Sequence, residues 1–311
     1  MEKIKGTPFL KLIFKLGVFI LLLGVCDFLI GSVLNYLYFH PKLKAQYETS
    51  YAFEKANEQI IIYGASTAEN HFNPSIIKAR TSYTCYNAGA AGQSILYIEA
   101  LNRCILKRCR PEIIILVLDW TLYDDQSFNK LGALLPYYQK HPEIREIIKQ
   151  RSRFESIKLL SHIYPFNSVL YQVCRQFYGT PRNKTTNGFL PENRKFKINY
   201  ANIRKDLAAP VSVSSEKYIA FNNFISLCKE KKIKLILTIA PTFDMNLVSR
   251  HLFSFSDSLS RANKIPLINF AQLDKISGKK ILFADNGHLN SNGADIFSTI
   301  FSDTLSKFIH K

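Results

Sequence analysis

Three short, almost uninterrupted runs of apolar residues constrain the fold of this chain more than any other feature. They are Gln59–Tyr63 (QIIIY), Glu112–Leu118 (EIIILVL) and Lys234–Ala240 (KLILTIA). A continuous apolar run of this length is typical of a strand that is buried on both faces, as in a parallel sheet. Two shorter strands are predicted at Thr84–Asn87 and Pro266–Phe270.

Helical spacing follows or precedes these strands. We expect helices from Ser94 to about Lys107, over 215–231, over 244–263, and from Gly293 to the C-terminus. Strands that alternate with helices predict an α/β fold, in which a doubly wound parallel sheet carries helices on both faces.

The N-terminal part contains a candidate membrane span. From Gly17 to Phe39 the chain has 23 residues whose only formal charge is Asp27. A helix rises about 1.5 Å per residue, so this run can cross a hydrocarbon core of roughly 30 Å. A signal peptide is the rival interpretation, but no small-x-small cleavage site follows the run. Four lysines precede the run and predict a cytoplasmic N-terminus: Lys3, Lys5, Lys11 and Lys15.

We therefore predict a single-pass membrane protein with a cytoplasmic tail and anchor at 1–44 and an extracytoplasmic domain at 45–311. Asp27 could bind a partner helix, or it could lie near the interface if the span is shifted by a few residues. The aromatic residues at the end of the run are expected at the far membrane interface: Tyr36, Tyr38 and Phe39.

The charge balance points to an acidic partner. The chain has 41 Lys and Arg against 24 Asp and Glu, a formal net charge of +17. Nucleic acid, an anionic membrane surface and an anionic polymer all fit this charge. An extracytoplasmic domain disfavours nucleic acid and leaves the membrane and the polymer.

The βα alternation stops between residues 126 and 213. This insert holds 15 Lys and Arg, 5 Asp and Glu and twelve Phe and Tyr, so it carries +10 of the net charge. Helical pieces are expected at 142–160 and 166–178, and 179–213 looks irregular. Inserts of this size in a compact domain are usually functional or form a subdomain.

Three polar segments follow predicted strands or precede the last helix. They are Gly64–Thr67 (GAST), Asn87–Gly92 (NAGAAG) and Asp285–His288 (DNGH). In open parallel sheets the ligand site lies at the carboxyl ends of the strands, so we expect these segments to meet there.

Together the segments supply the groups that acyl transfer needs. A Ser after a strand presents its hydroxyl to the crevice beside backbone N–H groups, and a D-x-x-H loop can present an imidazole with its orienting carboxylate. Each segment alone also fits a simpler structural role: Ser66 as a helix cap, the glycines as turn residues, and Asp285 as a cap of the final helix.

On these motifs the chain resembles the SGNH (GDSL-like) hydrolase superfamily, over about 58–125 and 214–311. The resemblance implies a flavodoxin-like, three-layer α/β/α fold with an N-terminal transmembrane helix and a mostly helical or irregular insert. It implies Ser66 as nucleophile and Asp285 and His288 as the other triad members. The N–H groups of Ser66 and Gly92 would form the oxyanion hole.

The sequence FADNGHLNSNGADIF around His288 is similar to membrane-anchored members of the superfamily. These include the D-alanyl-lipoteichoic-acid protein family and the alginate acetylation proteins, which modify cell-envelope polymers.

The chain departs from the superfamily at its third motif, where an Asn normally donates to the oxyanion. Here Leu118–Asp124 reads LDWTLYD. Thr121 is the nearest positional match, and Trp120 could offer its indole N–H instead. Loss of one oxyanion donor costs about 10²–10³ in rate, so the departure fits a slow hydrolase, a transferase or a degenerate enzyme.

Further candidates are substrate-binding residues. His71, in ENHFNP, either lines the site or is structural, and Trp120, Arg151 and Arg153 are candidates for holding a glycan through aromatic and cationic contacts. No Cys/His cluster has zinc spacing and no phosphate-binding loop is present, so we expect neither a metal nor another cofactor.

The sequence predicts a membrane-anchored serine acyltransferase or esterase acting on O-acetyl or other acyl groups. Its substrate would be a cell-envelope polysaccharide or a lipid-linked glycan, and the resemblance suggests a multi-pass acyl-exporting membrane protein as partner. The alternative is a catalytically degenerate protein of the same fold that binds the polysaccharide or helps to assemble the modification complex.

Overall fold

A parallel sheet of five strands forms the centre of the molecule. The computed structural model describes residues 8–40, 44–119, 122, 130–175, 177, 186–198, 213–243 and 250–309. The strand order is β2-β1-β3-β4-β5, and all pairings are parallel. The bounds are β1 Ile60–Tyr63, β2 Cys85–Asn87, β3 Ile113–Val117, β4 Lys234–Ile239 and β5 Leu267–Asn269. This confirms the predicted fold class.

The central strands are apolar along their whole length because helices cover both faces of the sheet. Alternate residues enter different cores: Ile61 and Ile114 belong to one cluster, and Ile60 and Ile113 belong to the other. All of β1 and β3 is buried as a result.

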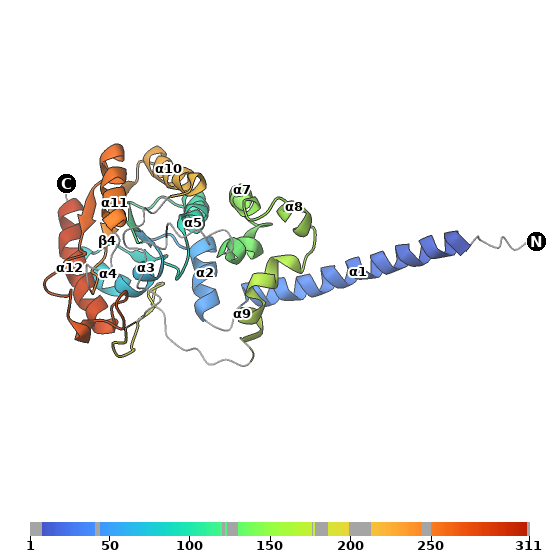
Figure 1. Cartoon of the computed structure of the whole chain (residues 1–311), viewed down its shortest axis with the longest axis horizontal. Helices are drawn as coiled ribbons and strands as arrows, with labels where there is room; N and C mark the ends of the chain where they lie inside the picture. Colours follow the sequence, from blue (N-terminus) through green and yellow to red (C-terminus); the bar gives the residue numbers. More distant parts are fainter. Residues whose placement is uncertain are drawn as a thin grey trace, which may run out of the picture.

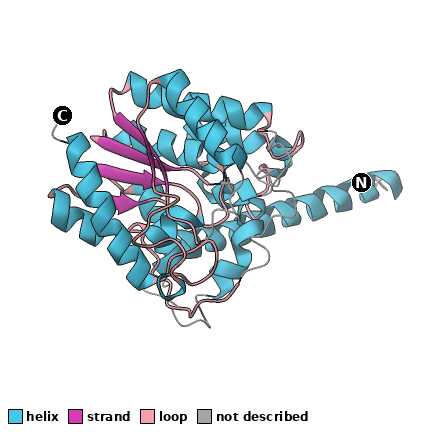
Figure 2. Ribbon diagram, turned by 60° about the vertical axis from the view of Figure 1, so that its left-hand side comes forward, coloured by secondary structure: helices cyan, strands magenta, loops and turns pink. Residues whose placement is uncertain are grey.

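The two helical layers give the α/β/α arrangement (Figure 2). One core includes side chains of α2 (Lys44–Glu54), α5 (Ile95–Arg108), α10 (Ser215–Glu230) and α11 (Arg250–Asn263). The other includes side chains of α3 (Ser66–His71), α4 (Pro74–Thr81) and α12 (Ser291–Ile309). The short 3-10 helix η7 (Lys280–Leu282) precedes α12.

The N-terminal helix α1 runs from Pro8 to Phe39 and projects from the rest of the molecule (Figure 1). It is long and apolar enough to cross a membrane by length and composition, a test that a signal sequence also passes, and its most apolar window is entirely unburied.

The C-terminal end of α1 differs from the expectation. Tyr38 is 3% exposed and packs edge-on against Tyr137 of the insert, so its ring is covered by protein. Asp27 is engaged within the chain itself, because its carboxylate accepts hydrogen bonds from Ser161 and from the backbone of His162.

The insert packs on the same core as the α/β domain. Its buried Leu135 and Ile148 share a cluster with Ile114 of β3. The helices predicted at 142–160 and 166–178 are each broken into shorter pieces, two of which begin around Pro142 and Pro165. The pieces are η3 Pro142–Ile144, α7 Arg145–Lys149, α8 Glu155–Lys158, η4 Tyr164–Val169 and α9 Leu170–Arg175. A further short helix, η2 Leu131–Tyr137, lies outside both predicted ranges. The division into 1–44 and 45–311 stays a prediction.

Candidate active site

Ser66 lies at the point where the strand order of the sheet reverses. It is the first residue of α3, directly after β1, and β1 pairs with β2 on one side and β3 on the other. Gly64 permits the tight turn before it, since a Cβ there would sit 2.6 Å from Cβ of Ala68 and 3.1 Å from the carbonyl oxygen of Val117. In open α/β sheets this crevice is the usual ligand site.

Backbone hydrogen bonds within the loop stabilise the conformation of the segment that carries Asp285 and His288. Phe283 and Leu289 form an antiparallel bridge, and the Ala284 N–H donates to the His288 carbonyl oxygen at 2.9 Å. The Asp285 Oδ1 atom accepts from the Gly287 and His288 N–H groups at 2.8 and 2.9 Å. These two backbone hydrogen bonds therefore fix the orientation of the Asp285 carboxylate independently of any side-chain contact.

The structure brings Ser66, His288 and Asp285 into one hydrogen-bonded chain. The His288 Nε2 atom lies 2.8 Å from Ser66 Oγ, and Nδ1 lies 2.9 Å from Asp285 Oδ1. A carboxylate only accepts, so Nδ1 carries the proton and Nε2 is left to accept from the serine hydroxyl. Nucleophile, base and orienting acid are in the geometry that nucleophilic catalysis requires.

The electrostatics favour a charged Asp285. Burial acts to raise the pKa of its carboxyl, but the hydrogen bond and charge of His288 and the two backbone N–H groups outweigh it and hold the pKa below its ordinary value. Asp285 is 3% exposed. A buried, ionised carboxylate at this position stabilises the imidazolium that forms when His288 takes a proton.

His71 supports this loop from behind, which fits the structural one of the two roles that the sequence left open. The ring is completely buried, because α3 turns this residue inward. Its Nε2 atom accepts the Leu289 N–H at 2.9 Å, and burial lowers the pKa of His71 to about 3, so the ring stays neutral. His71 thus positions the residue next to His288.

Gly92 lies in the turn between β2 and α5 with φ +71°. The loop is tied to the serine turn, because the Ala90 N–H donates to the Gly64 carbonyl oxygen at 3.0 Å. The oxyanion role of Gly92 and Ser66 stays a prediction. Thr121 and Trp120, the other two candidates at this edge, lie outside the described residues.

Glu69, which the sequence analysis did not single out, also faces this loop. It is one turn beyond Ser66, and its carboxylate accepts a hydrogen bond from the Ala91 backbone. Burial raises the pKa of Glu69 to about 7, against the opposing effects of that bond and of the charge of His288. The sequence feature that could have identified Glu69 as a site residue is its position three residues after Ser66.

The second half of the insert, residues 186–198, reaches the site. Its backbone bonds to both catalytic loops: the Leu190 N–H donates to the Glu69 carbonyl oxygen and the Lys197 N–H to that of Ala284, each at 3.0 Å. Arg194 comes from this segment. Its Nη2 atom is 2.9 Å from Glu192 and 3.7 Å from Asp285 Oδ2.

A pocket of about 420 Å³ opens beside Arg194. The second half of the insert contributes Lys195 and Phe196, and the segment before the catalytic loop contributes Lys280. The Lys280 ammonium lies 5.8 Å from the centroid of the Phe196 ring. The pocket is thus lined by three basic side chains, an aromatic ring and the carboxylate of Glu192, and Arg194 links it to Asp285 of the triad. Its only signal in the sequence was the basic composition of the insert.

Arg151 and Arg153 lie in the first half of the insert, which Figure 1 places beside α1. Arg151 pairs with buried Glu155 and donates to the Tyr164 hydroxyl, so it holds the insert together. Its predicted role in holding a glycan stays a prediction. Arg153 is exposed and lies over the Phe154 ring at 4.5 Å.

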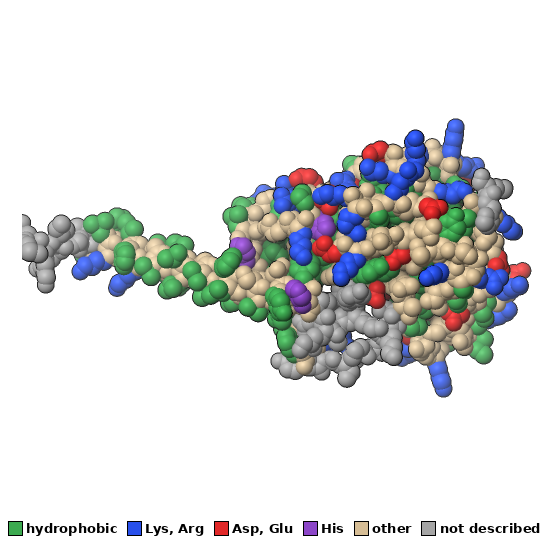
Figure 3. All heavy atoms as spheres, turned by 180° about the vertical axis from the view of Figure 1, so that it is seen from behind, with side chains coloured by type: hydrophobic (Ala, Val, Ile, Leu, Met, Phe, Trp, Pro, Cys, Tyr) green, Lys and Arg blue, Asp and Glu red, His purple; other side chains and the backbone are tan. Residues whose placement is uncertain are grey.

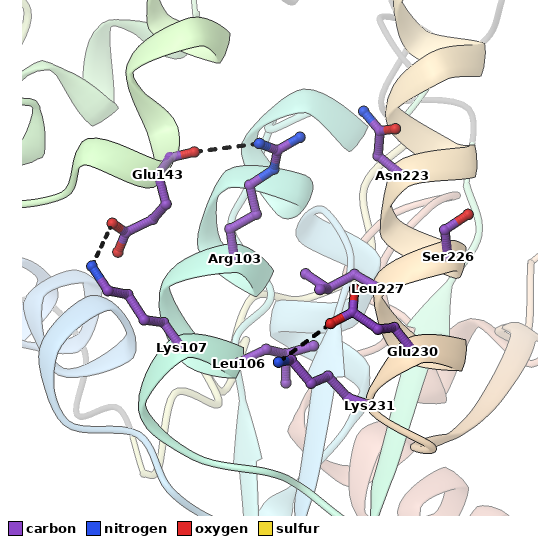
Figure 4. Close-up of a pocket in the computed structure, with 9 residues that line it drawn as sticks. All are labelled: Arg103, Leu106, Lys107, Glu143, Asn223, Ser226, Leu227, Glu230 and Lys231. Atoms are coloured by element: carbon purple, nitrogen blue, oxygen red, sulfur yellow. Dashed lines mark hydrogen bonds and ion pairs between the residues drawn. The ribbon is translucent and has the colours of Figure 1, made fainter.

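A second group of polar residues lies away from the triad, between α5, α10 and η3. Cys104, His141 and Glu143 come close enough to hold a metal ion, although the sequence led us to expect none. Glu143 pairs with Lys107 at 3.0 Å and His141 contacts Glu54 at 3.1 Å. Figure 4 shows Glu143 paired with Lys107 and, nearby, Glu230 paired with Lys231. The charged side chains in this region therefore form ion pairs with one another.

No protein-family model and no curated protein matches the chain. Among solved structures it is similar to the acetyl xylan esterase AlAXEase, with 12% identity, 80% of this chain and 99% of that chain covered, and a TM-score of 0.40. It is also similar to a GDSL-like lipase from Bacteroides thetaiotaomicron, with 16% identity, coverage of 80% and 87%, and a TM-score of 0.37.

A third similar structure is a catalytic mutant of an acetylxylan esterase from Geobacillus stearothermophilus, with 11% identity, coverage of 79% and 93%, and a TM-score of 0.38. These similarities are similarities of fold.

Proposed function

We propose that this chain is a membrane-anchored serine esterase or acyltransferase. The observation that carries the proposal is the continuous hydrogen-bonded chain from Ser66 through His288 to buried Asp285. Residues from two loops that are 222 positions apart meet at hydrogen-bond distance, at the sheet edge where ligands bind.

The geometry supports a two-step reaction. Ser66 Oγ attacks the acyl carbonyl carbon while His288 Nε2 takes the hydroxyl proton, and the backbone N–H groups of Ser66 and Gly92 would stabilise the oxyanion. His288 then gives this proton to the leaving alcohol oxygen, and an acyl-serine remains. Water or a sugar hydroxyl attacks that ester, with His288 again taking the proton, and Ser66 is regenerated.

For the substrate we propose acyl groups, O-acetyl foremost, on an acidic polysaccharide or lipid-linked glycan of the cell envelope. The cationic pocket beside the triad supports this choice, because Arg194, Lys195 and Lys280 can meet carboxylate or phosphate groups while Phe196 offers a face for a sugar ring. The apolar helix α1 supports a place at the membrane. A multi-pass acyl-exporting protein as partner remains an expectation from the resemblance.

The test is labelling of the full-length protein with a serine-directed fluorophosphonate, followed by hydrolysis of p-nitrophenyl acetate. The wild type and a Ser75→Ala control, which removes an exposed hydroxyl from α4, should label and turn over equally. Ser66→Ala should lose both labelling and turnover. Labelling that survives in Ser66→Ala would contradict the proposal, and a wild type that binds acidic glycan without labelling would favour the degenerate binding protein.

A further inference from the structure

The insert contacts the apolar helix in the middle of that helix as well as at its C-terminal end. Asp27 Oδ1 accepts from the Ser161 hydroxyl at 2.5 Å and from the Ile163 N–H at 3.3 Å, and Oδ2 accepts from the His162 N–H at 2.6 Å. One carboxylate therefore caps a whole turn of the insert, which explains how a charge is tolerated in the apolar run.

Side-chain packing continues this attachment along α1. Gly31 lies so close to His162 that a Cβ at this glycine would overlap the His162 Cβ. Phe28 packs edge-on against the His162 ring, with centroids 5.2 Å apart. From Gly31 to Phe39 the helix is partly covered by protein, whereas nearly all residues from Pro8 to Ile30 are exposed.

The length of α1 shows where the attached turn lies relative to a bilayer. The last lysine before the apolar run is Lys15, and twelve residues separate it from Asp27. At about 1.5 Å per residue this is about 18 Å, whereas the hydrocarbon core is about 30 Å thick. Counted from Lys11, the distance is about 24 Å, which is still too short. The turn at Ser161–Ile163 would therefore lie within the outer leaflet.

The surface around this turn is suited to lipid. Leu160 is 78% exposed and Tyr171 is 73% exposed, and further large apolar side chains are exposed nearby in the sequence: Phe154, Ile157 and Leu170. Figure 3 shows hydrophobic side chains at the end of the globular part from which α1 projects. Arg153 and Lys158 can extend their charged ends toward the headgroups while their stems lie along apolar surface.

The buried carboxylate in this part of the insert has partners within the protein, as burial in lipid demands. Glu155 is 1% exposed and pairs with Arg151, and the Tyr164 hydroxyl donates to it at 2.7 Å.

We propose that residues 154–171, which we name the collar, are embedded in the outer leaflet of the bilayer that α1 crosses. The collar then acts as a monotopic membrane element around the transmembrane helix, and its ligand is the acyl-chain and headgroup region of that leaflet. This inference rests on α1 being retained as a membrane span, and it is independent of the chemistry at Ser66.

The experiment measures how deeply single tryptophans lie in vesicles. The full-length protein contains one Trp, at position 120, so the Trp120→Phe variant has no tryptophan fluorescence of its own. Three variants are made on it: Leu160→Trp in the collar, Leu21→Trp in α1, and Tyr218→Trp on α10, all at exposed positions. Each is reconstituted in phosphatidylcholine vesicles with and without bromine on the lipid acyl chains, which quenches nearby indoles.

We expect brominated lipid to reduce the emission of Leu160→Trp and Leu21→Trp severalfold and to leave Tyr218→Trp unchanged. Quenching of Leu21→Trp alone would overturn the collar while leaving the membrane span intact. No quenching in any variant would overturn both the span and the collar. Ile157→Trp, also exposed, repeats the measurement if Leu160→Trp does not fold. Labelling of Ser66 tests the proposed function separately.

Discussion

Replacing Asp285 by Asn removes one charge from the site and almost no volume. The Oδ1 atom of Asp285 accepts from three donors, the N–H groups of Gly287 and His288 and the His288 Nδ1–H. An Asn oxygen can keep all three bonds, so the loop should keep its shape. The amide nitrogen then replaces Oδ2, which lies 3.1 Å from His288 Nδ1, and it faces an N–H with another donor.

The expected loss follows from the attraction between the carboxylate and the imidazolium that forms during the reaction. For charges 2.9 Å apart and an effective dielectric of about 20, the Coulomb energy is about 6 kcal/mol. A barrier higher by this amount lowers the rate by about 10⁴-fold. Exposed Arg194, 3.7 Å from Oδ2, already offsets part of the carboxylate charge, so we expect kcat to fall about 10³–10⁴-fold.

The assay is hydrolysis of p-nitrophenyl acetate by the full-length protein, with thermal unfolding measured in parallel. Asp303→Asn is the matched control, because it removes an exposed carboxylate that pairs with Arg80 on the outer helices, and it should retain wild-type kcat. A folded Asp285→Asn protein with more than a tenth of wild-type kcat would refute the role assigned to this carboxylate.

Three further predictions concern groups around the triad. Because the pKa of His71 is lowered to about 3 from about 6.5 in an unfolded chain, the unfolded state binds more protons between these values, and the free energy of unfolding should fall by about 1.4 kcal/mol per pH unit below pH 6.5. Glu69 titrates in the opposite sense over this range, so the loss is measured as a difference between the two proteins. Urea unfolding should show the wild type losing about 2 kcal/mol relative to His71→Gln between pH 7.5 and pH 5, and a difference that does not change with pH would contradict the prediction. The pKa of Glu69 is raised to about 7, so the folded state binds more protons than the unfolded state between about pH 4.5 and pH 7, and the wild type loses stability as the pH rises through this range. Glu69→Gln should therefore be more stable than wild type at pH 8 but not at pH 4, and equal stability at pH 8 would contradict the raised pKa. Arg194→Gln should weaken binding of an acidic polysaccharide in a salt-dependent way, measured by titration calorimetry, whereas Arg261→Gln on α11, which is exposed, should not; equal binding by both variants would remove Arg194 from the glycan site.

The sequence predicts those parts of the site whose functional residues lie within one short segment and form a recognisable motif there. Ser66 follows an apolar strand at once, and Asp285 and His288 stand three residues apart in one loop. Parallel strands end at one edge, where the ligand site of an open sheet lies, and this places the Ser66 turn there. The Asp285–His288 loop lies just before α12 and not directly after a strand. The strands were predictable for a similar reason, because a strand buried on both faces is apolar at every position and stands out from its polar flanks.

The parts that the sequence misses depend on contacts between distant segments. Asp27 and Ser161 are 134 positions apart, and no periodicity in the insert shows which of its turns meets α1. Arg194 belongs to a stretch without helical or strand spacing, so only its charge was visible. His71 looked like a site residue because it is close to Ser66 in sequence, but a six-residue helix turned its ring into the core.

The insert is best understood as two structures with different roles. Its first half packs through Tyr137 and Ser161 on α1, and its second half bonds through Leu190 and Lys197 to the loops of the triad. A single chain segment thus connects the apolar helix α1 with the rim of the site. If both halves act as proposed, a glycan held at Arg194 would be bound by a domain whose depth at the membrane is fixed by the collar, and this favours substrates that are themselves attached to, or made at, the same membrane surface.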